Sequence, residues 1–164
     1  MPKMKQVEVE QFLNEPGHLL RLGTVDDASM PSVVPIWFLY QDNQLWFTPR
    51  AKSEWFGHLR ANPNVCCTID ESQGSMRKLI ARGQATMVHD TGNDDEWRDI
   101  YRDITTRYVP TNFADAYLTD THDEPRGLWK LDLAGARVET WRMPTGDGED
   151  SLAVWAPKYY HDGR

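Results

Sequence analysis

The chain has 164 residues, 40% hydrophobic and 26% charged, which is the composition of a folded globular protein and the length of one domain. Its 18 basic and 25 acidic residues give a net charge of -7, which argues against a nucleic acid or an anionic membrane as the main partner. No apolar stretch approaches the roughly 18 residues of a membrane span, and no secretory leader follows Met1, so we expect a cytoplasmic protein.

The first elements along the chain are predicted to be a helix and three strands. Residues 5–14 place apolar side chains at helical spacing and are followed by Pro16-Gly17, which ends the helix. Strands are expected over residues 18–25, 32–40 and 44–48, with short polar turns between them. Such turns predict an antiparallel meander.

The second of these strands is apolar on both faces. Val33, Val34 and Ile36 follow one another with only Pro35 between them, so both faces need a cover. A second layer or a second subunit would supply it, which indicates a homodimer. Because Pro35 has no backbone N–H, we expect a bulge, an edge position or a gap facing a ligand there.

The remaining elements alternate between strands and helices. They are a helix over 52–61, strands over 64–70 and 76–89, helices from Asp94 and over 112–118, and a closing hairpin of 127–133 with 137–143. Gly83, inside the long strand, predicts a bulge or a close backbone approach. The pattern predicts one mainly β domain over 1–164, a closed or split β-barrel with peripheral helices. Its parts are barrel strands within 18–90 and 127–143, a helical insertion over 93–119 and a tail over 144–164.

Several kinds of site are not supported by the sequence. There is no glycine-rich phosphate loop, and the five histidines form no paired metal motif. Ser53 has no flanking glycines of the kind that mark a nucleophile turn. Cys66 and Cys67 are adjacent, so they form neither an ordinary disulfide nor a metal site together, and on a strand they point to opposite faces.

The basic residues are concentrated in one segment. Residues 50–82 hold six basic and three acidic residues, a charge of +3, against -10 for the rest of the chain. Within it, residues 48–53 place two cations and two hydroxyls between the end of a predicted strand and the start of a predicted helix. This combination of donors suits a small phosphate-bearing ligand. Arg77 and Lys78 add charge if their strand lies alongside. A solvated turn beside a helix is the alternative.

Five segments in order, with the terminal hairpin, resemble the pyridoxamine 5'-phosphate oxidase-like FMN-binding split-barrel proteins. They are Leu22-Gly-Thr-Val25, Pro31-Ser-Val-Val-Pro-Ile-Trp-Phe38, Leu45-Trp-Phe-Thr48, Leu59-Arg-Ala-Asn-Pro-Asn-Val65 and Gly83-Gln-Ala85. The resemblance implies a homodimer with FMN at the subunit interface. It also implies a site for the FMN phosphate, formed by Thr48, Arg50, Lys52, Ser53 and either Arg77 or Lys78. The flavin ring would lie along Val34, Pro35, Ile36 and Trp37.

The sequence departs from this family at one place. Where many members have a lysine at the start of the helix, this chain has Trp55, so a deazaflavin or haem stays open as an alternative to FMN. No counterpart of the namesake enzyme's arginine-containing substrate motif is found near Trp141-Arg142, so vitamin synthesis is not predicted.

Three functions follow from this reading. The first is an FMN-dependent oxidoreductase that transfers hydride to or from a small molecule, for which the flavin needs no dedicated acid or base. A deazaflavin-dependent reductase is a variant of it. The second is a flavin or haem carrier or sensor without turnover, and the third is a dimer without a cofactor.

Overall fold

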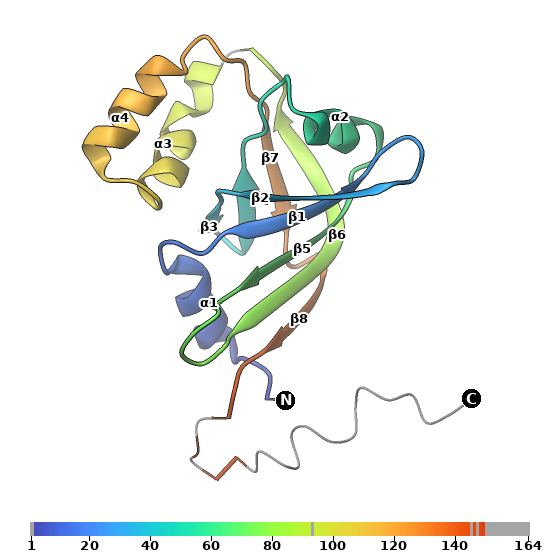
Figure 1. Ribbon diagram of the computed structural model, residues 1–164, viewed down its shortest axis with the longest axis vertical. Helices are drawn as coiled ribbons and strands as arrows, with labels where there is room; N and C mark the ends of the chain where they lie inside the picture. Colours follow the sequence, from blue (N-terminus) through green and yellow to red (C-terminus); the bar gives the residue numbers. More distant parts are fainter. Residues whose placement is uncertain (1, 93, 145, 147, 150–164) are drawn as a thin grey trace.

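The computed structural model describes residues 2–92, 94–144, 146, 148 and 149, so most of the predicted tail, with Trp155, Tyr159 and Tyr160, lies outside the described residues. Most helices and strands appear where the sequence predicts them (Figure 1). In chain order they are α1 (Gln6–Asn14), β1 (Leu20–Val25), β2 (Pro31–Ile36), β3 (Leu39–Gln41), β4 (Gln44–Phe47), α2 (Glu54–Ala61), β5 (Asn64–Asp70), β6 (Lys78–His89), the 3-10 helix η1 (Asp94–Trp97), α3 (Arg98–Thr106), α4 (Thr111–Asp120), β7 (Leu128–Asp132) and β8 (Arg137–Trp141).

The strands form an antiparallel sheet that curls into a split barrel. Its strand order is β2-β1-β5-β6-β7-β4-β3, with β8 paired to β6. The strands at the two ends of this order, β2 and β3, are joined along the chain by only Trp37 and Phe38. Two residues span a few ångströms, so the two ends of the sheet must lie next to each other. The predicted mainly β split barrel is confirmed.

The single strand predicted over residues 32–40 is wrong, because the chain leaves one end of the sheet at Ile36 and enters the other at Leu39. The backbone N–H of Phe38 donates to the hydroxyl of Tyr108, 3.1 Å away, instead of to a neighbouring strand. Pro35 has no N–H to contribute, and it lies in β2 at the end of the sheet, which confirms the edge position expected there.

The closing hairpin is also corrected, since β7 and β8 do not pair with each other. Both pair with β6, which is twelve residues long: β8 with its first half and β7 with its second. Gly83 lies between the two halves, and a Cβ there would be 3.1 Å from the side chain of Leu131 and 3.2 Å from that of Ala136. The close approach expected at Gly83 is therefore confirmed.

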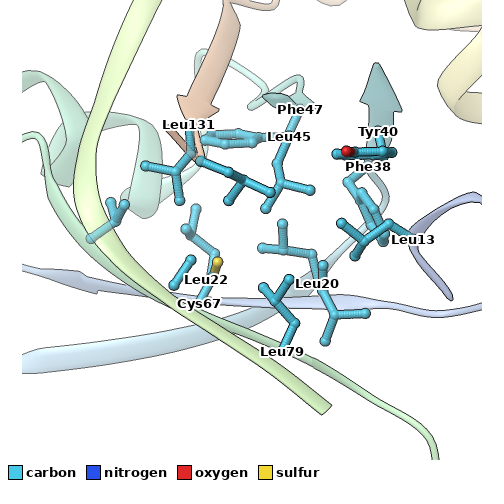
Figure 2. Packing of buried hydrophobic residues seen from close by; sticks show 14 of the residues in the cluster. Leu13, Leu20, Leu22, Phe38, Tyr40, Leu45, Phe47, Cys67, Leu79 and Leu131 are labelled. Atoms are coloured by element: carbon cyan, nitrogen blue, oxygen red, sulfur yellow. The ribbon is translucent and has the colours of Figure 1, made fainter. Parts of the chain in front are cut away.

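The core fills the space between the two curled halves of the sheet. Figure 2 shows Leu20 and Leu22 of β1 facing Leu45 and Phe47 of β4, and all four are fully buried. Cys67 belongs to this core whereas Cys66 is exposed, so the two cysteines do point to opposite faces. Each fully buried Leu or Phe side chain of this core stabilises the fold by about 1.5–3 kcal/mol.

The predicted helical insertion is present as η1, α3 and α4, and α3 lies beside α4 at one end of the barrel (Figure 1). It has a small core of its own, in which Trp97, Tyr101 and Leu118 pack against Leu128 of β7. The insertion is thus anchored to the barrel rather than extended from it. Within the described residues, no helix combines the length and apolarity needed to cross a bilayer.

Candidate functional site

A cavity of about 290 Å³ lies where the barrel meets the insertion. Its walls come from the end of β2, the segment between β4 and α2, the helices α3 and α4, and the residue two places before β7. The lining residues are Pro35, Ile36, Trp37, Thr48, Arg50, Ser53, Trp55, Tyr101, Ile104, Tyr117 and Arg126. Short segments that are distant in sequence meet here because β4 and β7 pair directly.

The structure brings together six of the ten residues predicted to hold a cofactor. Those that line the cavity are Pro35, Ile36, Trp37, Thr48, Arg50 and Ser53. Val34 packs against the barrel core and does not line the cavity. Lys52 has an exposed side chain that pairs with Glu124 at 2.8 Å and does not line the cavity.

Arg77 and Lys78 lie away from this cavity. Arg77 is enclosed by two carboxylates, with Nη2 at 2.6 Å from Glu15 and 2.7 Å from Glu71. Lys78 places its ammonium 4.4 Å from the ring centroid of Trp141. Lys78 begins β6 and Arg77 directly precedes it; because β7 separates β6 from β4, these residues do not reach the segment after β4.

The cluster around Arg77 also contains the one group of potential metal ligands found in the described residues, Glu15, His18 and Glu71. Arg77 donates to both carboxylates and thereby offsets part of their negative charge. These hydrogen bonds lower the pKa of Glu71 and of Glu15, and the cluster is accounted for as an internal ion-pair network.

Within the cavity, Arg50 is held by three neighbours. Its Nε lies 3.0 Å from Glu124, and its Nη2 donates to the hydroxyl of Tyr117 at 3.1 Å. Ser53 donates from Oγ to the carbonyl of Arg50 at 2.7 Å, which fixes the turn that leads into α2. The guanidinium is therefore positioned before any ligand binds.

An aromatic wall faces these polar groups. Trp37 stacks on Tyr108 with ring centroids 5.0 Å apart and 5° between the planes. Trp55, at the place where a lysine is expected from the resemblance, packs 6.2 Å from the ring of Phe47. A cavity with an aromatic wall and a nearby cation suits a planar ligand that carries an anionic group.

Sequence reasoning missed the contribution of the insertion and of the segment before β7. Tyr101, Ile104 and Tyr117 come from α3 and α4, and Arg126 precedes β7. Arg126 is 6% exposed, and its Nε has no hydrogen-bond partner. The sequence does hold a signal for the insertion's contribution: its aromatic residues are at helical spacing, which indicates a helix face that packs against another part of the protein.

A larger and more open groove, of about 840 Å³, lies on the face of the sheet that points away from the barrel core. It crosses β1, β2, β5 and β6, and its lining includes Val33, Cys66 and Ile80. Val33 is 65% exposed. Its charged side chains are largely paired, Arg21 with Asp70 and Arg82 with Glu139, so the smaller cavity is the better candidate for chemistry.

Comparison with known proteins places the chain in a family. The family model of pyridoxamine 5'-phosphate oxidase matches residues 6–141. A conserved hypothetical protein from Mycobacterium tuberculosis has the same fold, with 18% identity, a TM-score of 0.69 and coverage of 91% of this chain and 94% of its own. No curated protein sequence matches significantly.

Two further solved structures share the fold. The heme storage protein HutZ from Vibrio cholerae is 20% identical, with a TM-score of 0.61 and coverage of 82% of this chain and 94% of its own. A FAD-binding protein from Mesorhizobium loti is 21% identical, with a TM-score of 0.56 and coverage of 85% and 95%. At these identities the likeness is one of fold. Since the family model spans most of the chain and the curled sheet agrees with it, this protein belongs to the pyridoxamine 5'-phosphate oxidase family.

Proposed function

We propose that the protein is an FMN-dependent oxidoreductase that acts on a small molecule and binds the flavin in the cavity between the barrel and the insertion. The observation that carries this proposal is the combination of an aromatic wall at Trp37 with a fixed guanidinium at Arg50 in one cavity. When bound, the flavin supplies hydride transfer, while the protein supplies position and electrostatics.

The donor set of the cavity fits a flavin phosphate. Arg50, the hydroxyl of Thr48 and the start of α2 offer charged and neutral donors within one turn of chain. Arg126, which lines the same cavity and whose Nε makes no hydrogen bond, adds a second guanidinium. Pro35, Ile36 and Trp37 would lie along the ring, with the end of β2 exposing backbone polar groups to it.

The cavity suits a flavin better than haem. Among the residues that line it, there is no His, Cys or Met, the axial ligands that haem proteins use most often. A deazaflavin remains the alternative for the same aromatic wall. The volume of about 290 Å³ is just below the roughly 300–1,000 Å³ usual for ligand sites, which supports a site completed by a second chain.

We propose a homodimer in which a second copy of this chain covers the open groove on the sheet. The groove and the cavity share β2, since Pro31, Ser32 and Val33 line the groove and Pro35, Ile36 and Trp37 line the cavity. A chain seated on the first would therefore reach the mouth of the second. The groove carries both signs of charge, Asp70 beside Arg21 and Lys78, which allows a two-fold contact with itself.

Titration of the purified protein with FMN, followed by flavin fluorescence, tests the function. We expect Arg50→Ala to weaken FMN binding about ten- to hundred-fold, because it removes a charged hydrogen bond. Arg60→Ala is the matched control, since Arg60 lies on α2 but pairs with Asp90 outside the cavity. Unchanged affinity in the Arg50 variant, or no binding in the wild type, would contradict the proposal.

A second measurement separates an oxidoreductase from a carrier or sensor. The loaded protein is mixed with NADPH, and the loss of flavin absorbance is followed before and after addition of a candidate acceptor. Reduction followed by reoxidation supports turnover. A flavin that binds but stays oxidised under both conditions would favour the carrier.

A further inference from the structure

Two arginines of the cavity are held directly opposite each other by the backbone. Arg50 follows β4 and Arg126 precedes β7, and the two form an isolated antiparallel bridge. Two hydrogen bonds fix it, from the N–H of Ala51 to the carbonyl of Pro125 at 2.9 Å and from that of Gly127 to the carbonyl of Pro49 at 3.0 Å. Opposed side chains of an antiparallel pair share one face, and like charges in such a pair repel.

A single acceptor lies between the two guanidiniums. Arg50 and Arg126 each donate from Nη2 to the hydroxyl oxygen of Tyr117, and both distances are 3.1 Å. Tyr117 comes from α4, so the insertion provides the group that separates two cations of the barrel. Glu124 forms an ion pair with Arg50 at 3.0 Å but not with Arg126, and the neutral phenol offsets the charge of Arg126 only in part.

The guanidinium of Arg126 makes no direct ion pair within the part of the chain that the structure describes. Its guanidinium contacts the carbonyl of Thr48, 3.4 Å from Nη1, and the ring of Tyr101, whose centroid is 4.5 Å from the guanidinium carbon. Two carboxylates lie nearby: Asp94 accepts from the backbone N–H of Arg126 at 3.2 Å, and the charge of Arg126 helps to lower the pKa of Glu124. The side chain is buried and its Nε makes no hydrogen bond. A buried guanidinium that makes no direct ion pair is costly to the fold, so this geometry favours the binding of an anion.

We propose that Arg50 and Arg126 together form a binding position for one compact oxyanion, a phosphate or a carboxylate, and that this anion displaces the hydroxyl of Tyr117 as their shared acceptor. The inference rests on the proposed function for the source of the anion, which is either the phosphate of the flavin or an acidic group of the substrate. The position itself is defined by this chain's own residues.

The protonation of Tyr117 is coupled to this position. Burial opposes ionisation of Tyr117, but the hydroxyl of Tyr101 and the guanidiniums of Arg50 and Arg126 outweigh it, so the pKa of Tyr117 lies below its ordinary value. Glu124 faces the same group through its ion pair with Arg50. The ionised phenol and an external anion compete for the same donors, so a bound anion raises the pKa of Tyr117, and anion affinity falls as pH rises through that pKa.

Ultraviolet titration of tyrosine ionisation in the purified protein tests the coupling. One tyrosine is expected to ionise below the others, and this step should disappear in Tyr117→Phe. The matched control is Tyr40→Phe, because burial raises the pKa of Tyr40 and its removal leaves the early step in place. Inorganic phosphate should move the early step to higher pH by about one unit.

The arginine variants decide whether the two guanidiniums are responsible. In Arg126→Gln, and independently in Arg50→Gln should the first fail to fold, phosphate should no longer shift the step. An unchanged wild-type titration with phosphate, or an equal shift in a folded arginine variant, would overturn the proposal.

Comparing FMN with riboflavin, which lacks the phosphate, identifies the source of the anion. If FMN shifts the step and riboflavin does not, the position takes the cofactor phosphate. If FMN binds without a shift and phosphate still shifts the loaded protein, the position takes a substrate anion. If phosphate shifts the early tyrosine step but no flavin binds, the proposed function is refuted and the anion position is supported. If flavin binds but phosphate shifts nothing, the proposed function is supported and the anion position is refuted.

Discussion

Trp37 and Tyr108 stack face to face at the split of the barrel, with 5.0 Å between ring centroids. Trp37 belongs to the two-residue link between β2 and β3, and Tyr108 follows α3. The hydroxyl of Tyr108 accepts from the N–H of Phe38 at 3.1 Å and donates to the carbonyl of His18 at 2.8 Å. The insertion thus closes the seam of the barrel and holds one wall of the cavity.

Removing only the hydroxyl of Tyr108 tests this closure. Tyr108→Phe keeps the stack but leaves a half-buried N–H and a carbonyl without their partner, so we expect a loss of about 2 kcal/mol in unfolding free energy. Urea denaturation measures it. Tyr40→Phe is the control, because the hydroxyl of the buried Tyr40 makes no hydrogen bond within the described residues, and an equal loss there would contradict the assignment.

The ion-pair network of Arg77 predicts the acid limit of stability. Hydrogen bonds from Arg77 lower the pKa of Glu71 and of Glu15 in the folded protein. Such carboxyls stabilise the fold fully above their unfolded pKa of about 4.3, and this contribution is lost as pH falls through their folded pKa. Wild-type unfolding free energy should therefore decline below about pH 4.5.

Arg77→Gln should flatten that decline and cost about 2 kcal/mol at neutral pH. It should leave FMN affinity unchanged, because Arg77 lies outside the cavity. Urea titrations over a pH series and a flavin titration measure the two effects. If Arg77→Gln had normal stability but bound FMN more weakly, Arg77 would belong to the cofactor site and the interpretation as an ion-pair network would be wrong.

Alanine substitutions at Gly23 and Gly57 are expected to change the stability of the protein in opposite directions. A Cβ at Gly23 would lie 2.9 Å from the carbonyl oxygen of Cys66 on the neighbouring strand. Gly23→Ala must push β1 from β5, at a cost of about 1–3 kcal/mol. Gly57→Ala, on α2 with no atom within 4 Å of its Cβ, should instead stabilise by about 0.5–1 kcal/mol. Thermal unfolding of both variants checks the pair.

The two cysteines report on the proposed dimer. Cys66 is exposed in the open groove, whereas burial raises the pKa of Cys67 to about 12. A thiol reagent at neutral pH should label Cys66 rapidly and Cys67 only after unfolding. If a second copy covers the groove, labelling of Cys66 slows as protein concentration rises. A rate independent of concentration, with a monomer in sedimentation, would contradict the dimer.

The sequence predicted the elements well because their signals are local. Helix α1 and strand β5 lie within one residue of their expected bounds. The division at Trp37 was missed because its cause is remote: the acceptor for the N–H of Phe38 is 70 residues further along the chain. Likewise the pairing of β8 with β6 instead of β7 depends on how the whole sheet curls.

The candidate site was half predictable for the same reason. Thr48, Arg50 and Ser53 are close in sequence and meet in the cavity. Arg77 lies in the same basic segment, yet its partner Glu15 is 62 residues earlier, so nearness in sequence did not mean a shared site. Arg126 becomes visible only through its bridge to Arg50, which no local pattern announces.

The position of β6 has a consequence for biosynthesis. One edge of this strand is reserved for residues that come some forty to sixty positions later, in β7 and β8. While a ribosome makes the intervening insertion, that edge and the edge of β4 have no strand to pair with, and unpaired edges are where nascent chains associate wrongly. The nascent sheet is therefore complete only after Trp141 has left the exit tunnel, and a chain truncated before β7 is expected to aggregate rather than form a smaller barrel.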